Sequence, residues 1–111
     1  MQIHGAKDNT VPYEGNDNRK PIDDVMEYWV NYNGCNMTPS EIIIENNDED
    51  GLGGTLSVNN GCMNDVSVEL YCLDGLGHQW PSIKRTRVFD IDSTSVIWEF
   101  FFKYDVDGSM E

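Results

Sequence analysis

A strand-like run at residues 66–73 and the glycine-rich loop behind it constrain the fold more than any other feature of the chain. The run reads VSVELYCL and alternates apolar with polar side chains, a period of two that is typical of a β-strand with one face more buried. The loop at 74–81 reads DGLGHQWP, and its glycines at 75 and 77 permit positive φ angles and tight turns. We therefore predict a strand that places His78 just beyond its carboxyl end.

The first residues predict a second strand. Met1-Gln2-Ile3-His4 is extended and apolar enough for a short buried strand, and Gly5 marks its end. Asp8 follows a few residues later and thus sits just past this strand's carboxyl end. Considered alone, Asp8 is read equally well as a turn residue that bonds its own backbone. A core strand that begins at the first residue leads us to expect that the chain is a piece of a longer protein.

A helix is expected over residues 22–33. Pro21 suits a helix entry, and Asn33-Gly34 supplies the stop. Apolar side chains recur at helical spacing, which predicts an aromatic stripe in the core formed by Ile22, Val25, Met26, Trp29 and Tyr32. This helix is interpreted as a crossover that lets the strands at 1–4 and 66–73 run parallel in one sheet.

A small β excursion on the surface is expected after this helix. Short strands are predicted at 41–45 and 55–58, with an acidic turn at 46–51 between them. The Asn and Asp spacing of the turn partly matches a calcium-binding loop. Its twelfth position is Ser57 instead of glutamate, so a solvated acidic turn is the preferred interpretation.

The last part of the chain predicts a second helix. Asp90-Ile91-Asp92-Ser93 supplies helix-starting residues. The apolar face behind them is so broad that we expect a largely buried helix; its side chains are Val96, Ile97, Trp98, Phe100, Phe101 and Tyr104. Residues 105–111 are polar and are expected to form a tail or the start of a linker.

Charge and cysteine content narrow the classes of function. Seven basic residues stand against 20 acidic ones, a net charge of −13, so we expect no nucleic-acid partner and no anionic membrane partner. No apolar run approaches the roughly 18 residues of a membrane span. The three cysteines lack C-x-x-C spacing, and we expect neither a metal nor a cofactor. Cys35 and Cys62 bracket the β excursion and are hypothesised to pair, which leaves Cys72 as a free thiol.

Two motifs and a helix resemble a known family. HGAKDNTVPY at 4–13 and GLGHQWP at 75–81, with IWEFF at 97–101 behind them, resemble the C-terminal part of the polyhydroxybutyrate depolymerase and feruloyl esterase group. The resemblance implies an α/β fold class, as the C-terminal portion of an α/β-hydrolase fold with two parallel core strands, a crossover helix, a small β excursion and a C-terminal helix. Residues 1–104 would then be the C-terminal part of a single domain, and 105–111 its tail.

The same resemblance implies roles for individual residues. Asp8 is the expected acid and His78 the expected base of a serine-hydrolase triad. Asp74 is the rival orienting acid, and Asp8 is preferred because Asp74 closes its own strand and would more readily cap the turn. Trp80 is expected either to line the substrate pocket or to anchor the loop by packing. Cys35 and Cys62 fall where secreted members often carry a cystine, so secretion is implied. The implied substrate is a polyester or an aryl ester.

The nucleophile of such an enzyme is missing from the sequence. No G-x-S-x-G motif occurs, so we expect these 111 residues to be inactive alone and to require the N-terminal remainder of the hydrolase domain. Two other interpretations stay open. One is a stand-alone binding or structural half-domain without catalysis, and the other is a calcium-dependent surface module at residues 46–57.

Overall fold

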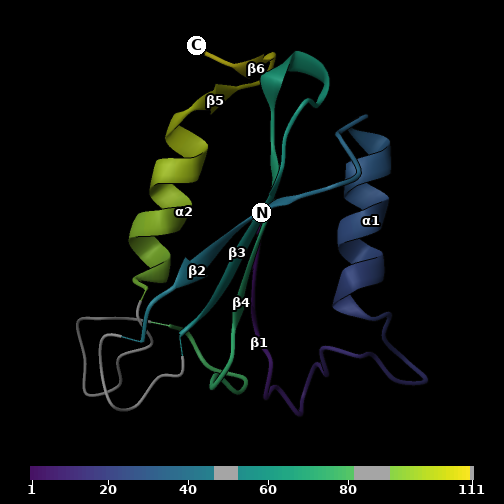
Figure 1. The fold of residues 1–111 in the computed structure, drawn as a ribbon, viewed down its shortest axis with the longest axis vertical. Coiled ribbons are helices and arrows are strands. Elements are labelled where there is room, and N and C mark those ends of the chain that lie inside the picture. Colours follow the sequence, from purple (N-terminus) through teal and green to yellow (C-terminus); the bar gives the residue numbers. More distant parts are fainter. Residues whose placement is uncertain (47–52, 82–90, 111) are drawn as a thin grey trace.

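A four-stranded sheet lies between two helices in the computed structural model, which describes residues 1–46, 53–81 and 91–110 (Figure 1). The sheet order is β1-β4-β3-β2, with strands β1 (Gln2–Gly5), β2 (Ser40–Ile44), β3 (Gly54–Asn59) and β4 (Val68–Leu73). The helices are α1 (Ile22–Tyr32) and α2 (Ser93–Phe102). Shorter elements are the 3₁₀ turn η1 (Met63–Asp65) and the hairpin strands β5 (Tyr104–Asp105) and β6 (Gly108–Ser109).

The sheet is mixed, and the expected fold class is wrong. Among the described strands of this sheet, only β1 and β4 pair in parallel, whereas β4 with β3 and β3 with β2 pair antiparallel. The segment expected as a surface excursion therefore forms half of the sheet. One parallel pair inside such a sheet is not the parallel core, with its crossover helices, that a portion of an α/β-hydrolase requires.

The pairing of β3 with β4, which the sequence did not predict, depends on a close backbone approach. Gly54 pairs with Leu73, and a Cβ atom added to Gly54 would lie 2.1 Å from the Cys72 carbonyl oxygen. The absence of a side chain at this position therefore lets β3 run along the whole of β4. Sequence alternation reveals that β3 is a strand, but it does not reveal which neighbour the strand pairs with.

Strand β4 is covered on both faces, as its central position demands. Val68 packs on one face with Val30 of α1. Leu73 packs on the other face with Leu76 and Ile91, and Val96 of α2 lies against that cluster. Two separate apolar clusters, one under each helix, therefore hold the sheet in place.

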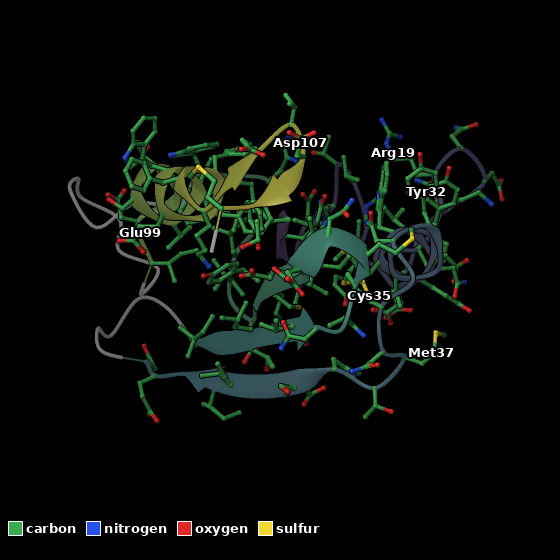
Figure 2. All side chains as sticks on the ribbon, turned by 90° about the horizontal axis from the view of Figure 1, so that it is seen from above. Arg19, Tyr32, Cys35, Met37, Glu99 and Asp107 are labelled. Atoms are coloured by element: carbon green, nitrogen blue, oxygen red, sulfur yellow. A yellow bond between two sulfur atoms is a disulfide. The ribbon has the colours of Figure 1, made fainter. Side chains whose placement is uncertain are left out.

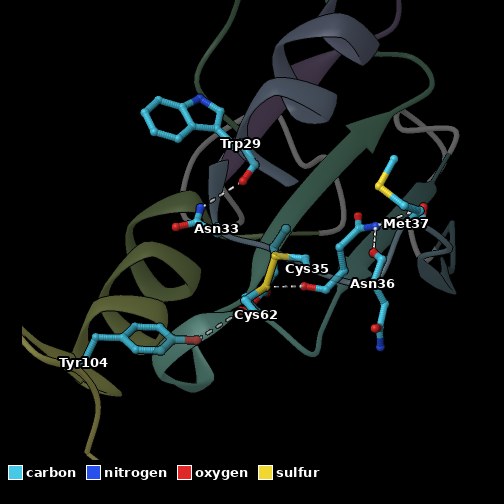
Figure 3. Close-up of a disulfide and its surroundings, with 10 residues drawn as sticks. Trp29, Asn33, Cys35, Asn36, Met37, Cys62 and Tyr104 are labelled. Carbon is cyan, nitrogen blue, oxygen red and sulfur yellow. Dashed lines mark hydrogen bonds between the residues drawn. A yellow bond between two sulfur atoms is a disulfide. The ribbon is translucent and has the colours of Figure 1, made fainter. Parts of the chain in front are cut away.

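The hypothesised disulfide between Cys35 and Cys62 is confirmed. Both cysteines are buried and belong to the cluster of Val30 and Val68 (Figure 3). The bond ties the end of α1 to the segment that leads into β4, across a sequence separation of 27 residues. Cys72 is a free, half-buried thiol.

Helix α1 begins where it was expected to, but its aromatic side chains are not in the core. Ile22 and Val30 are buried, whereas Trp29 is 46% exposed and Tyr32 is 65% exposed. Tyr32 lies on the outer side of the helix in Figure 2. The buried face is thus narrower than the apolar spacing predicted, because a single sheet face contacts the helix.

Helix α2 also differs from the expectation that it is largely buried. Trp98, Phe101 and Phe102 are each more than 60% exposed. Val96 reaches the core, so the helix contacts the sheet along one narrow line. Edge strand β2 shows the same property, because Ile42 and Ile43 are also exposed.

The end of the chain carries more structure than a simple tail. Strands β5 and β6 form a hairpin, and the hydroxyl oxygens of Tyr104 and Ser67 lie 3.0 Å apart in a hydrogen bond. Within the described residues no helix is long and apolar enough to cross a membrane. The acidic turn of the calcium interpretation lies outside the described residues, apart from Asn46.

Candidate functional site

Two loops interlock at the carboxyl ends of β1 and β4. The backbone N–H of Ala6 donates to the carbonyl oxygen of Leu73 at 2.9 Å, and the N–H of Lys7 donates to that of Leu76 at 2.9 Å. The loop after β1 is thereby fastened to the loop after β4. Residues that are 70 positions apart in the sequence meet at this edge of the sheet.

Asp8 is buried in the first loop, and its two carboxylate oxygens have separate partners. Oδ1 accepts hydrogen bonds from the backbone N–H groups of Thr10 at 2.9 Å and Val11 at 2.7 Å. Oδ2 lies 2.9 Å from Nδ1 of His78. Asp8 therefore bonds the backbone of its own turn with one oxygen and His78 with the other, so both interpretations of this residue apply.

The charged form of Asp8 is favoured in this environment. Burial alone would raise the pKa of Asp8, but the hydrogen bonds from Val11, His78 and Thr10 together lower it below its ordinary value. An ionised carboxylate can only accept hydrogen bonds. Nδ1 of His78 therefore carries the proton, and its N–H group donates a hydrogen bond to Asp8.

The imidazole of His78 is much more exposed than the carboxylate of Asp8. The His78 side chain is 60% exposed, whereas the Asp8 side chain is 5% exposed. With Nδ1 protonated and held by Asp8, Nε2 of the neutral ring has a free lone pair, which is the state of a general base. Because the Nδ1–H group of His78 donates its hydrogen bond to Asp8, it does not donate one to Asp74. Asp74 is exposed and directly follows β4.

The glycines of these loops serve a different purpose from the predicted one. The chain turns at Asp74 and Gly75 as expected, but neither Gly75 nor Gly77 has a positive φ angle. Gly5 is the critical glycine, because a Cβ atom there would lie 2.1 Å from the carbonyl oxygen of Leu76. The second loop crosses directly over Gly5, and only a residue without a side chain permits that contact.

A cavity of about 470 Å³ opens beside the Asp8–His78 pair. Its walls include Gln2, Gln79 and Trp80. The Trp80 side chain is 63% exposed. A second cavity of about 230 Å³ lies beside Trp80 and extends to Ile97 of α2, so Trp80 borders both spaces.

No nucleophile accompanies the pair in the part of the chain that the structure describes. Within residues 1–46, 53–81 and 91–110, no serine hydroxyl is hydrogen-bonded to His78. Ser67 donates to Glu69, and Ser95 donates to Asp92. Ser82 lies outside the described residues.

Sequence reasoning missed a third residue of the site. His4 is buried next to Asp8, with its Nε2 atom 3.7 Å from Oδ2. The feature of the sequence that could have identified His4 is its position four residues before Asp8, near the end of β1. That spacing is informative only when the backbone is known to fold back on itself between the two residues.

Metal binding finds no support in the described residues. Across the three described ranges, no group of three or more His, Cys, Asp or Glu residues is placed to hold a metal ion.

Comparison with protein-family models, with curated proteins and with solved structures finds no significant match. The resemblance to ester hydrolases therefore rests on the two short motifs and the helix behind them.

Proposed function

We propose that Asp8 and His78 are the acid and base of a serine ester hydrolase whose nucleophile lies outside these 111 residues. One observation carries the proposal: the 2.9 Å contact between Asp8 Oδ2 and His78 Nδ1, in a pair of residues that both line a cavity. A buried carboxylate that holds an exposed imidazole in one tautomer is the arrangement that activates a serine hydroxyl.

The chemistry would be acyl transfer. Nε2 of His78 takes the proton of a serine hydroxyl as the serine oxygen attacks the ester carbonyl carbon. The same nitrogen then returns the proton to the departing alcohol, and water hydrolyses the acyl-enzyme by a repeat of these steps. Asp8 keeps the ring orientation and stabilises the imidazolium formed in each transfer.

The substrate class belongs to the proposal as well. Trp80 stands between two cavities and offers an exposed aromatic face to an acyl or aryl group of an ester. A polyester or an aryl ester would fit such a wall. The disulfide is typical of oxidising compartments, and secretion is proposed on that basis.

A fluorophosphonate probe tests the proposal, because it labels only an activated serine. The probe should label a longer natural protein that contains these residues after a G-x-S-x-G segment, and should leave the 111 residues alone unlabelled. Asp8→Asn in that protein should reduce kcat by about 10⁴-fold, and His78→Ala should abolish labelling. A longer protein with an intact motif that does not react would refute the function.

A non-catalytic binding half-domain is the second candidate, and one observation favours it. Both helices expose large aromatic side chains, with Tyr28, Trp29 and Tyr32 on α1 and Trp98, Phe101 and Phe102 on α2. Exposed apolar surface of this kind is where another polypeptide packs. A monodisperse 111-residue protein with one cooperative melting transition and no serine-bearing extension in its gene would favour this candidate.

A further inference from the structure

His4 occupies a buried position beneath the turn that carries Asp8. The residue is 7% exposed, and both of its ring nitrogens are engaged. Nε2 lies 2.7 Å from the carbonyl oxygen of Val11, and Nδ1 lies 3.3 Å from the side-chain amide nitrogen of Gln2. Because a carbonyl oxygen can only accept, Nε2 carries the proton and Nδ1 accepts from Gln2.

Val11 is thereby held from both sides. Its N–H donates to Oδ1 of Asp8 at 2.7 Å, and its carbonyl oxygen accepts from His4 at 2.7 Å. Two hydrogen bonds therefore connect Asp8 to Val11 and Val11 to His4, and the backbone between His4 and Asp8 completes a ring. The turn cannot rotate without breaking one of these bonds, so the direction of the carboxylate is set by His4 as well as by its own N–H partners.

We propose that His4 is a positioning residue for the Asp8–His78 pair. By holding the carbonyl of Val11, it keeps Oδ1 occupied by the turn and leaves Oδ2 facing His78. The importance of His4 for catalysis rests on the function proposed above, whereas its effect on the geometry of the pair does not.

A direct catalytic role for His4 is excluded by the same geometry. Its Nε2–H bond is already donated to a backbone carbonyl, and the ring is buried under the turn. The ring of Tyr13 lies edge-on to it at a centroid distance of 6.1 Å. His4 therefore acts on the reaction only through the position of Asp8.

Two amide substitutions provide a matched test. The side-chain nitrogen of glutamine reaches the position of Nε2, whereas that of asparagine reaches only the position of Nδ1. His4→Gln should keep the bond to Val11, and His4→Asn should lose it. In His4→Asn we expect hydrogen exchange of the Val11 N–H to be at least about fivefold faster, together with a changed Nδ1–H resonance of His78, and both should be close to wild type in His4→Gln.

The wild-type protein decides the matter if His4→Asn does not fold. Two-bond ¹H–¹⁵N correlation spectra report the tautomer of each histidine, and His4 should be the Nε2–H form. An Nδ1–H tautomer at His4 would overturn the proposal. So would a folded His4→Asn variant whose His78 resonance and Val11 exchange match those of wild type. A failure of the fluorophosphonate experiment leaves all these spectra unaffected, so the two proposals fail separately.

Discussion

Asp8 binds its partners with both oxygens, and this makes its ionisation part of the folding equilibrium. Its pKa in the folded chain lies below the ordinary value of 3.8 because the turn N–H groups and His78 outweigh the effect of burial. A carboxyl group with a lowered folded pKa stabilises the native state at pH values above its unfolded pKa. That contribution is lost as the pH falls through the folded pKa.

We therefore predict an acid-sensitive contribution from Asp8 below about pH 4. Asp8→Asn should be less stable than wild type at neutral pH, and the difference in unfolding free energy should shrink as the pH falls below that value. Denaturant unfolding at a series of pH values measures the difference, and comparison with wild type cancels the other carboxylates. An unchanged difference down to pH 2 would contradict the prediction.

Gly5 is the residue on which the meeting of the two loops depends. Gly5→Ala would place a Cβ atom 2.1 Å from the carbonyl oxygen of Leu76, so the loop that carries His78 must move. We expect a loss of about 1–3 kcal/mol in unfolding free energy and a weakened Asp8–His78 contact.

Gly77→Ala is the matched control for this substitution. The nearest atom to a Cβ atom there is the carbonyl oxygen of Lys7 at 3.9 Å, and Gly77 does not have a positive φ angle. We expect a change within about 0.5 kcal/mol. Chemical denaturation of both variants measures the two effects, and equal losses would show that the crossing over Gly5 is not tight.

At the scale of elements, the disulfide links α1 to the entry of β4. The chain-entropy account gives roughly 3 to 4 kcal/mol for a loop of this length. Replacing both Cys35 and Cys62 by serine should lower the unfolding free energy by that amount. The single substitution of the free thiol, Cys72→Ser, is the control and should cost much less, because this residue is only half-buried. Equal midpoints in guanidinium for the three proteins would contradict the prediction.

The helices and strands also show which structural properties local sequence patterns predict correctly. Period-two alternation revealed β4, and the helical spacing with Pro21 revealed α1 almost to its bounds. The same patterns overestimated burial, because an apolar stripe states what a helix can bury and not what is present to cover it. Trp98, Phe101 and Phe102 are apolar at helical spacing and yet exposed.

At the scale of the whole molecule, the excess of acidic residues opposes compactness. A net charge of −13 on 111 residues makes the folded chain repel itself, and salt screens this repulsion. We predict that Tm rises with sodium chloride concentration at pH 7, and a gain of about 1 kcal/mol would correspond to roughly 4–8 °C in a small domain.

Calorimetry at low and at high ionic strength checks this prediction. The gain should level off above about 0.5 M, where the Debye length is shorter than most distances between surface charges. At pH 4 the gain should be smaller because many carboxylates are then protonated. A Tm that falls with added salt would show that attractive charge pairs outweigh the repulsion.

The sequence by itself determined where the main strands and helices lie and that Asp8 and His78 each follow a strand, and it suggested the cysteine pair that the structure then confirmed. These properties are local or follow from spacing along the chain. The tertiary structure alone decided that β2 and β3 belong to the same sheet as β4, because pairing depends on contacts between distant residues. It also decided that His4 supports the turn at Asp8 and that Gly5 lies under the carbonyl of Leu76. The contact over Gly5 forms only when two loops cross, and neither loop carries a sign of the other in its own residues.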